Sequence, residues 1–413
     1  MKKYLFLLLL FGVTIVRAQT IITGQVIDEK TKETLPGVSI YVNNTTIGTI
    51  TDQNGKFSLS VSLTGKIEVV ASYVSYKKKV TIMEDYNGKM ITIALSPEDN
   101  TLKEVVIKAA KGDNYDKWGS LFSKMLLANT HSPGSCIIKN PEVMVFYFDQ
   151  EQNQLRAYAR GPLIIENNNL GYVLKLDLEE FNYDFGTDIL RAKYYTFFEE
   201  MKSPKIGMEA VLRQRNLAYY GSQMHFMRSV YENTLTRNGF KVYQYKSIKN
   251  SEKERVTKLV QERINRDTKI KSSVTYDLNK LFQPKDTAEY YKLVMSQNDI
   301  LSADTTLTAM RRYTKLDRTN DVVTFNTHDS LMVNYQQYLD RYNKVITPEQ
   351  KADWKLQNES KRFKGKNTIM YFAEDGGINI QSSGYYPELR LYYQGDMFER
   401  RVAQLLPWDY KPG

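Results

Sequence analysis

Apolar and polar residues alternate along the first quarter of the chain. In VSIYV, residues 38–42, and in FSLSV, residues 57–61, every second residue is apolar. A period of two predicts strands that bury one face. The same rhythm returns in residues 67–73, 80–82 and 91–95, and the turn signals DEKTKE, LPG, DQNG and YNG separate the runs. The pattern predicts an antiparallel β-sandwich of about seven strands.

The segment TDQNG, residues 51–55, predicts a hairpin turn inside this sandwich. Asp52 can accept hydrogen bonds from amides two residues on, Asn54 tolerates the left-handed region, and Gly55 takes positive φ without steric cost. A calcium loop would need further carboxylates at alternate positions, whereas KFS follows the glycine. We therefore expect a scaffold turn here.

Longer strands and helices are expected beyond the polar linker KGDN, residues 111–114. Apolar residues recur at helical spacing in residues 115–129 and predict an amphipathic helix. Leucines that alternate with charged residues in residues 172–185 predict antiparallel sheet with one solvated face. After residue 300 the strand-like segments predict a return to antiparallel sheet.

Between these regions the period changes to that of a helix. Residues 208–235 predict one long helix, which Gly239 ends. The mixed charges of residues 250–271 indicate a solvated helix or a surface segment. The apolar stripe of the long helix comprises Leu217, Tyr220, Met224, Met227 and Tyr231.

The first residues have the form of an export signal. A positive start with Lys2 and Lys3, an apolar run and the sequence VRA before Gln19 predict a signal peptide cleaved after Ala18. The run is shorter than the roughly 20 residues that a membrane span needs. The single cysteine, Cys136, lies far from the cleavage point, so no lipid anchor is expected. We expect a periplasmic or secreted protein, or one associated with the outer membrane, with no integral membrane span.

The fold class that follows is mainly β, with a sandwich and then a larger α+β region rich in antiparallel sheet. A length of 413 residues suggests two or three domains. We assign residues 1–18 to the signal peptide, 19–110 to the sandwich and 115–413 to an α+β domain that divides again near residue 300.

The charge excludes one class of partner. Removing Lys2, Lys3 and Arg17 with the signal takes three charges from the formal net charge of +10, which leaves +7. The excess is spread among many acids, whereas a nucleic-acid binder would show a clustered basic stripe. We expect no nucleic-acid partner. One cysteine allows no intrachain disulfide, so burial alone has to hold the fold.

Residues 21–109 carry a specific set of motifs. They open with ITGQVIDEKTKETLPGVSIYV, continue with GTITDQNGKF and close with LKEVV. This set resembles the carboxypeptidase regulatory-like domain found in many envelope proteins of Bacteroides-type bacteria, with Ser75 in place of the usual glycine of the fourth element. The resemblance implies a prealbumin-like sandwich. It implies no peptidase activity, because the name comes from an accessory domain of carboxypeptidases.

The second region has a resemblance of its own. SCIIKNPEVMVF, GPLIIENNNLGYVLKLDLEEF and YYGSQMHFMRS are similar to a C-terminal region that accompanies the same sandwich in uncharacterised envelope proteins of those bacteria. That resemblance supports the architecture and adds no catalytic residues.

No motif predicts a cofactor or a metal. The chain has three histidines, and none is followed by Glu three residues later, the pair with which the related zinc carboxypeptidases hold their metal. Nucleophile-elbow, Walker and dinucleotide-binding motifs are absent from the sequence. Adjacent acids such as Glu199 and Glu200 would point to opposite faces of a strand. A pair of carboxylates assembled by folding leaves no spacing signal, so a hydrolase stays open.

One polar cluster on the predicted long helix has two interpretations. Its arginines could hold a carboxylate or phosphate, with Ser222 and His225 facing each other. Alternatively, arginine and histidine tie the helix to a sheet through buried hydrogen bonds, the interpretation we favour because no oxyanion hole is visible. The cluster comprises Arg213, Arg215, Tyr219, Ser222, His225 and Arg228.

Two functions remain open. The first is a non-catalytic exported envelope protein whose sandwich mediates interaction or scaffolding with an envelope protein or a surface glycan. The alternative is a hydrolase with an unrecognised site in the second region.

Overall fold

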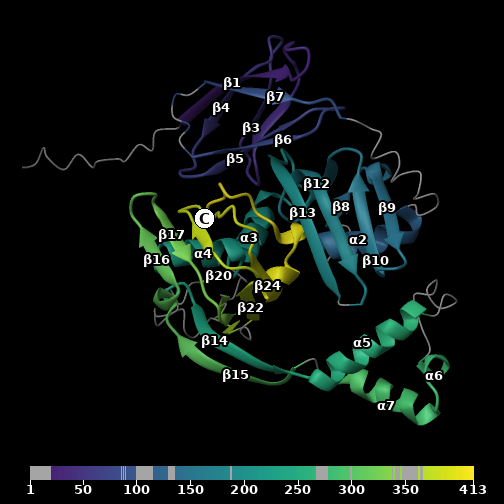
Figure 1. Cartoon of the computed structure of the whole chain (residues 1–413). Coiled ribbons are helices and arrows are strands. Elements are labelled where there is room, and N and C mark those ends of the chain that lie inside the picture. Colours follow the sequence, from purple (N-terminus) through teal and green to yellow (C-terminus); the bar gives the residue numbers. More distant parts are fainter. Residues whose placement is uncertain are drawn as a thin grey trace, which may run out of the picture.

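The alternating N-terminal segments form two sheets packed face to face, which Figure 1 shows in purple and blue for the computed structural model. One sheet has the strand order β4-β1-β7 and the other β3-β2-β5-β6. Residues such as Ile22, Ile40 and Leu59 are buried between the sheets. The strands are β1 (Thr20–Asp28), β2 (Ser39–Val42), β3 (Gly48–Ile50), β4 (Lys56–Val61), β5 (Ile67–Ser72), β6 (Lys79–Met83) and β7 (Met90–Leu95).

Part of the chain is placed well enough to describe. The predicted signal peptide, the linker of residues 111–114 and His131 lie outside it. The structure describes residues 20–84, 86, 88, 90–98, 115–128, 135–186, 188–266, 278–297, 300–336, 338–339, 345–346, 361–362 and 366–413.

The mainly β fold class is confirmed, and one strand pair departs from the antiparallel pattern. β1 pairs with β4 antiparallel but with β7 in parallel, with Thr23 opposite Met90. Side chains alternate in both kinds of pairing, so the sequence pattern carries no signal of strand direction.

The TDQNG turn is present, but it joins the two sheets and does not close a hairpin. β3 belongs to one sheet and β4 to the other. The Oδ1 atom of Asp52 accepts hydrogen bonds of 2.8 Å from the amides of Asn54 and Lys56. Gly55 has φ of 69°, the left-handed conformation that glycine tolerates best. The turn chemistry was predictable, whereas strand partners depend on contacts distant in sequence.

A six-stranded sheet and one helix form the next unit. Its strand order is β8-β11-β12-β10-β9, and β13 pairs with β12. The predicted amphipathic helix is α2 (Tyr115–Leu127), which buries Trp118, Phe122 and Leu126 against the sheet. The strands are β8 (Cys136–Ile138), β9 (Met144–Asp149), β10 (Gln154–Ala159), β11 (Leu163–Asn167), β12 (Tyr172–Asp184) and β13 (Ile189–Glu200), with a 3-10 turn at Pro141–Val143.

The predicted long helix is two helices. α3 (Met208–Tyr219) ends before Gly221, whose φ is 79°, and α4 (Gln223–Tyr231) begins after Ser222. The Ser222 hydroxyl accepts from the amide of His225 and caps α4. Gly239 has φ of 89° but lies after a loop, so Gly239 does not end the helix. The predicted stripe is split across the break, and Tyr220 is the residue that caps α3.

The chain after residue 300 forms antiparallel sheet, as predicted, and the strand of Phe240–Lys249 already belongs to it. A sheet ordered β15-β14-β18-β22-β24 packs beside a smaller one ordered β16-β17-β23, and three short strands form β20-β19-β21. These strands are β14 (Phe240–Lys249), β15 (Ile300–Thr308), β16 (Thr314–Asp317), β17 (Val322–Phe325), β18 (Ser330–Tyr335), β19 (Tyr338–Leu339), β20 (Val345–Ile346), β21 (Lys361–Arg362), β22 (Lys366–Phe372), β23 (Ile378–Ile380) and β24 (Leu391–Gly395).

Helices extend from the tip of the β14–β15 ribbon (Figure 1). The charge-rich segment forms α5 (Ser251–Arg266), a helix as expected, and Val256 and Val260 are buried in a small core shared with α6 (Leu278–Leu281) and α7 (Lys285–Ser296). Two short helices lie near the C-terminus: the α-helix α10 (Asp396–Glu399) and the 3-10 helix of Val402–Gln404. A further 3-10 helix spans Met310–Arg312.

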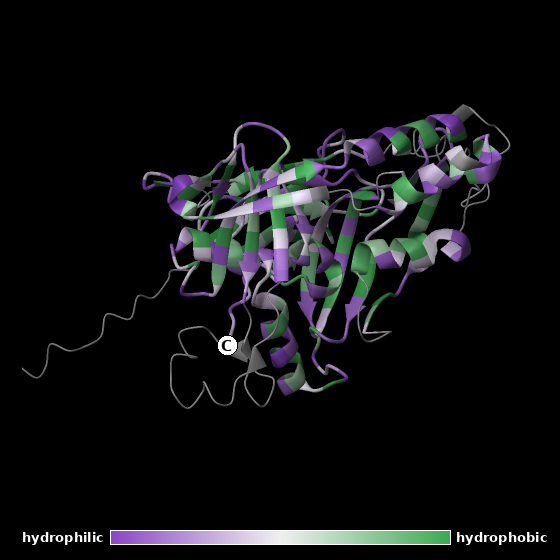
Figure 2. Cartoon of the chain, turned by 90° about the horizontal axis from the view of Figure 1, so that it is seen from below, coloured by the Kyte–Doolittle hydropathy of each residue, from purple (hydrophilic) through white to green (hydrophobic). Residues whose placement is uncertain are grey.

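Figure 2 shows hydrophilic and hydrophobic bands alternating along the strands, the pattern from which the sheets were predicted. Among the described residues, no helix is long and apolar enough to span a membrane.

Candidate functional site

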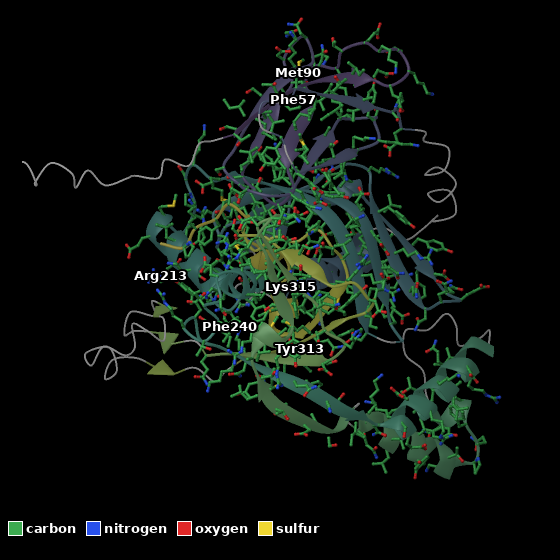
Figure 3. All side chains as sticks on the ribbon, turned by 60° about the vertical axis from the view of Figure 1, so that its left-hand side comes forward. Phe57, Met90, Arg213, Phe240, Tyr313 and Lys315 are labelled. Carbon is green, nitrogen blue, oxygen red and sulfur yellow. The ribbon has the colours of Figure 1, made fainter. Side chains whose placement is uncertain are left out.

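The predicted polar cluster does not converge on one site. Arg215 is buried under β12, where its guanidinium donates to the carbonyl of Leu170 at 2.8 Å and pairs with Glu200 at 2.9 Å. It also lies over the ring of Tyr172, 3.9 Å from the centroid. Arg213 is exposed at the periphery of the molecule (Figure 3). Arg215 therefore ties α3 to the six-stranded sheet.

Ser222 and His225 do not form a nucleophile and base pair. The hydroxyl of Ser222 accepts from the backbone amide of His225, and the Nδ1 atom of His225 accepts from the amide of Gly221 at 3.1 Å. Burial lowers the pKa of His225 to about 3, and Arg400 and Arg228 add repulsion of the charged form. The imidazole is neutral at pH 7, and its Nδ1 atom stabilises the break between α3 and α4 by accepting from the amide of Gly221.

Arg228 holds the C-terminal segment onto α4. Its guanidinium donates to the carbonyls of Ser383 at 2.8 Å, Trp408 at 2.8 Å and Tyr410 at 3.0 Å. It lies 5.5 Å from the ring centroid of Tyr219, and burial raises the pKa of that tyrosine. These are the contacts that a structural interpretation of the cluster requires.

A different set of residues meets where the sandwich lies on the six-stranded sheet. The turn between β2 and β3 lies beside β13, with Thr45 bridged to Phe197 in parallel. The amide of Asn44 donates to the carbonyl of Thr196 at 2.6 Å, and the amide of Phe198 donates to the carbonyl of Thr45 at 3.0 Å. Backbone pairing therefore continues the sheet into the sandwich and covers the edge of β13.

Charged groups reinforce this interface. The hydroxyl of Tyr41 donates to Asp177 at 2.6 Å, and the ammonium of Lys78 lies 2.5 Å from Glu179 and 3.6 Å from Asp177. Burial raises the pKa of Asp177, while Lys78 and Tyr41 oppose the rise. Burial, followed by the charge of Asp177, raises the pKa of Tyr41. The solvated face predicted for residues 172–185 is therefore partly covered by the sandwich.

A cleft of about 280 Å³ opens beside these charges. Gly48 and Phe197 both line this cleft. The two residues lie so close together that a Cβ atom at Gly48 would be 2.5 Å from the ring of Phe197. The carboxylate of Glu199 and the ammonium of Lys175, 2.5 Å apart, line the cleft together with Asp177. The cleft thus presents two carboxylates, one ammonium and aromatic rings.

Three further contacts hold the sandwich in place. The amide of Trp408 donates to the carbonyl of Asn44 at 2.8 Å, and Asp409 accepts from the amide of Thr46 at 3.1 Å. At the turn between β4 and β5, the side chain of Gln381 donates to the carbonyl of Lys66 at 3.0 Å. The sandwich thus contacts both the six-stranded sheet and the C-terminal sheets.

Sequence reasoning missed this interface. The signal available was the alternation in residues 173–179, which places Lys175, Asp177 and Glu179 on one face, but nothing in the pattern indicates what covers that face. Within the described residues, no group of three or more His, Cys, Asp or Glu is placed to hold a metal ion.

Comparison with known proteins places the sandwich in a family. Residues 22–107 match the family model of the CarboxypepD_reg-like domain, so the chain contains a domain of this family. A curated relative, the TonB-dependent receptor P39 of Formosa agariphila, is 31% identical over 97 residues, which are 24% of this chain and 9% of the receptor. This chain therefore spans less than a tenth of that relative's length.

Two solved structures were also matched. A 9R-lipoxygenase from Cyanothece PCC8801 is 13% identical over 53% of this chain and 49% of that chain, with a TM-score of 0.16. A protein from Bacteroides fragilis, described as membrane-associated and of unknown function, is 8% identical over 91% of this chain and 95% of that chain, with a TM-score of 0.15. At these TM-scores neither likeness carries an argument.

Proposed function

We propose that this chain is a non-catalytic exported protein of the bacterial cell envelope, in which the sandwich serves interaction or scaffolding with a protein or glycan partner. The observation that carries the proposal is the attachment of a CarboxypepD_reg-like sandwich to β12 and β13 through backbone and side-chain contacts. The likeness of this domain to part of a TonB-dependent receptor supports an envelope location.

The attachment leaves one face of the sandwich for a partner. The sheet β3-β2-β5-β6 lies against the second region, and the sheet β4-β1-β7 turns its outer face away (Figure 1). On that outer face Ile21 is 53% exposed and Met90 63% exposed, and Met90 lies at the far end of the sandwich in Figure 3. Exposed Thr23 and Thr92 accompany them. Hydroxyls around two apolar side chains suit contact with a glycan or a protein surface.

Cell fractionation followed by a binding assay tests this proposal. The exported form is expected to begin at Gln19 by mass spectrometry and to bind isolated envelope material. Arg substituted at both Ile21 and Met90 should reduce that binding by about tenfold, since a charge in a contact core costs ~1.4 kcal/mol or more. Leu316→Arg, at an exposed position on β16, is the matched control. Retention of residues 1–18 in the cytoplasm, or equal loss in both variants, contradicts the proposal.

We also propose that the sandwich of residues 19–110 folds without residues 115–413. Its own core, which includes Ile22, Val38 and Leu95, supports this boundary. The isolated fragment is expected to unfold cooperatively, and a non-cooperative transition would contradict the boundary.

A second candidate function is a hydrolase that uses the cleft beside Asp177. The observation that favours it is one carboxyl with a raised pKa, Asp177, in the same cleft as a second carboxylate, Glu199. When two carboxyl groups have unequal environments, their pKa values differ, so one can act as the general acid and the other as the base or nucleophile. Hydrolysis of a glycan panel that is lost in both Asp177→Asn and Glu199→Gln would support this candidate over the first.

A further inference from the structure

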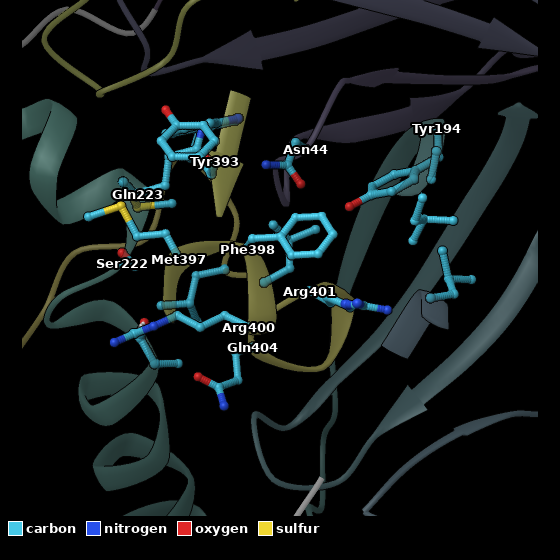
Figure 4. A pocket seen from close by; sticks show the side chains of 18 of the residues that line it. Asn44, Tyr194, Ser222, Gln223, Tyr393, Met397, Phe398, Arg400, Arg401 and Gln404 are labelled. Carbon is cyan, nitrogen blue, oxygen red and sulfur yellow. Dashed lines mark hydrogen bonds between the residues drawn. The ribbon is translucent and has the colours of Figure 1, made fainter. Parts of the chain in front are cut away.

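A second cavity, of about 270 Å³, lies where the sandwich, β13, α2, α4 and the C-terminal segment meet. Figure 4 shows side chains from these separate elements around it. It is distinct from the cleft at Asp177, because the two cavities have no lining residue in common. Most of its wall is apolar, and the apolar lining residues include Met125, Leu190, Met224, Met397, Phe398 and Leu405.

One guanidinium in this wall has unused donors. The Nη1 atom of Arg401 donates to the carbonyl of Met125, and the guanidinium lies 4.9 Å from the ring centroid of Phe398. Within the described part of the chain, no carboxylate lies within 4.0 Å of it. Burial lowers the pKa of Arg401, and Asp188 and Glu399 oppose the change from longer range. Arg401 is thus a half-buried cation whose Nε and Nη2 groups face no carboxylate.

The neighbouring arginine is already neutralised. Arg400 pairs with Asp396 through two hydrogen bonds of 2.9 and 3.1 Å and donates to the carbonyl of Ala218 at 2.8 Å. Its donors are therefore committed to the fold. Of the two arginines in the wall, Arg401 is the one available to a ligand.

Asn44 brings an unmatched acceptor to the same cavity. Its Oδ1 atom is buried and has no hydrogen-bond partner among the described residues, which is an unfavourable state for a polar atom. The polar ends of Asn44 and Tyr194 point toward the same part of the cavity in Figure 4. This oxygen can only accept, so a hydroxyl group or a water molecule bound beside the ligand would satisfy it, whereas a carboxylate would not.

Two of the residues that line this cavity have positive φ. Asn44 has φ of 57° and Arg401 has φ of 43°, in the left-handed half of conformational space that non-glycine residues seldom occupy. Asparagine tolerates this region, whereas for arginine it is a strained conformation of the kind that occurs at ligand sites. Asn44 and Arg401 come from segments far apart in sequence, and both line this one cavity.

We propose that this cavity binds a small amphiphile, with its apolar tail among the methionine, leucine and phenylalanine side chains and its carboxylate on the guanidinium of Arg401. The apolar wall supplies affinity through burial of the tail, and the guanidinium supplies selectivity for an anionic head. The inference does not depend on the partner of the outer sandwich face.

Calorimetry with decanoate and decanol tests the proposal on the mature full chain. Decanoate is expected to bind saturably, at one site. Arg401→Gln should weaken decanoate by about tenfold, because it removes one charge-assisted contact, and should leave decanol within about threefold. Arg213→Gln, at an exposed arginine on α3, is the matched control and should change neither affinity.

A second variant tests the cavity independently, in case Arg401→Gln reduces binding only because it destabilises the fold. Ala192 is exposed on β13 and lines the cavity, so Ala192→Trp fills the space without disturbing a buried core. This variant should abolish decanoate binding while its melting temperature stays that of the native chain, and Met90→Trp on the sandwich should bind normally. Absence of saturable decanoate binding to the native chain overturns the proposal. Unchanged decanoate affinity in either cavity variant does so as well.

Discussion

The hydroxyl of Tyr41 on β2 of the sandwich donates a 2.6 Å hydrogen bond to the carboxyl of Asp177 on β12. The two residues are 136 positions apart in sequence, and both are buried. A buried carboxyl needs partners, because an unsatisfied one carries the full cost of its lost hydration. This contact therefore links the six-stranded sheet to the sandwich and satisfies a buried carboxyl.

Removal of the Tyr41 hydroxyl is expected to lower the free energy of unfolding of the protein. Tyr41→Phe leaves Asp177 with Lys78 at 3.6 Å as its remaining charged partner. The expected loss in free energy of unfolding is about 1–3 kcal/mol, measured by urea denaturation. Tyr158→Phe, at a half-exposed position on β10, is the control and should change stability by less than about 0.5 kcal/mol. Equal stability of Tyr41→Phe and the native chain would count against the interface.

Gly48 should be required by the neighbouring ring of Phe197. Gly48→Ala would place a Cβ atom 2.5 Å from that ring and push the turn off β13, at an expected cost of about 1–3 kcal/mol. Phe197→Leu in the same chain should recover part of the loss, so the two changes should not be additive. Gly161→Ala, where nothing lies within 4 Å, is the matched control. Strict additivity in the double variant would show that the two residues do not touch.

The turn at Gly55 should behave as scaffold. Gly55→Ala forces a Cβ atom to within 2.7 Å of the Val26 carbonyl at φ of 69°, so a loss of about 2 kcal/mol or more is expected. Asp52→Ala removes the acceptor of two amide hydrogen bonds and should cost about 1 kcal/mol. Melting curves with calcium and with a chelator should coincide. A calcium-dependent rise that Asp52→Ala abolishes would contradict this role.

His225 should make stability depend on pH. The folded state holds its pKa at about 3, below the ordinary value of 6.5, so the unfolded state binds the proton first as the pH falls. Stability attributable to this residue is present above pH ~6.5 and is lost below it, by up to ~1.4 kcal/mol per pH unit. His225→Phe removes that dependence. Urea unfolding of both chains from pH 8 to pH 5 should give curves that converge toward low pH, and parallel curves would refute the assignment.

Local elements were predictable where they depend on short-range pattern. The alternation of the N-terminal strands, the helix of α2 and the turn at Asp52 follow from nearby residues. The break at Gly221 was missed because helix formers on both sides conceal it, and the cap by Ser222 becomes meaningful only once the break is known. The parallel pairing of β1 with β7 leaves no trace in side-chain alternation.

The candidate sites were less predictable, for a physical reason. Asp177 and Tyr41 meet only in the folded chain, and so do Asn44 and Arg401. The predicted cluster on α3 and α4 drew attention because its residues are close in sequence, yet its polar groups bind backbone carbonyls and a structural carboxylate. The spacing of residues along the chain predicts a functional site only when a single helix, strand or loop supplies all of its residues.

The attachment of the sandwich to the second region can be measured directly by zero-length carbodiimide coupling of the purified protein, followed by mass spectrometry. The ammonium of Lys78 lies 2.5 Å from Glu179 across the interface, and the ammonium of Lys66 lies 2.5 Å from Glu84 within the sandwich, which provides an internal control. The account predicts an amide bond between Lys78 and Glu179 together with the control bond between Lys66 and Glu84. Formation of the control bond alone would contradict the account, because it would show a folded sandwich that is not held on β12.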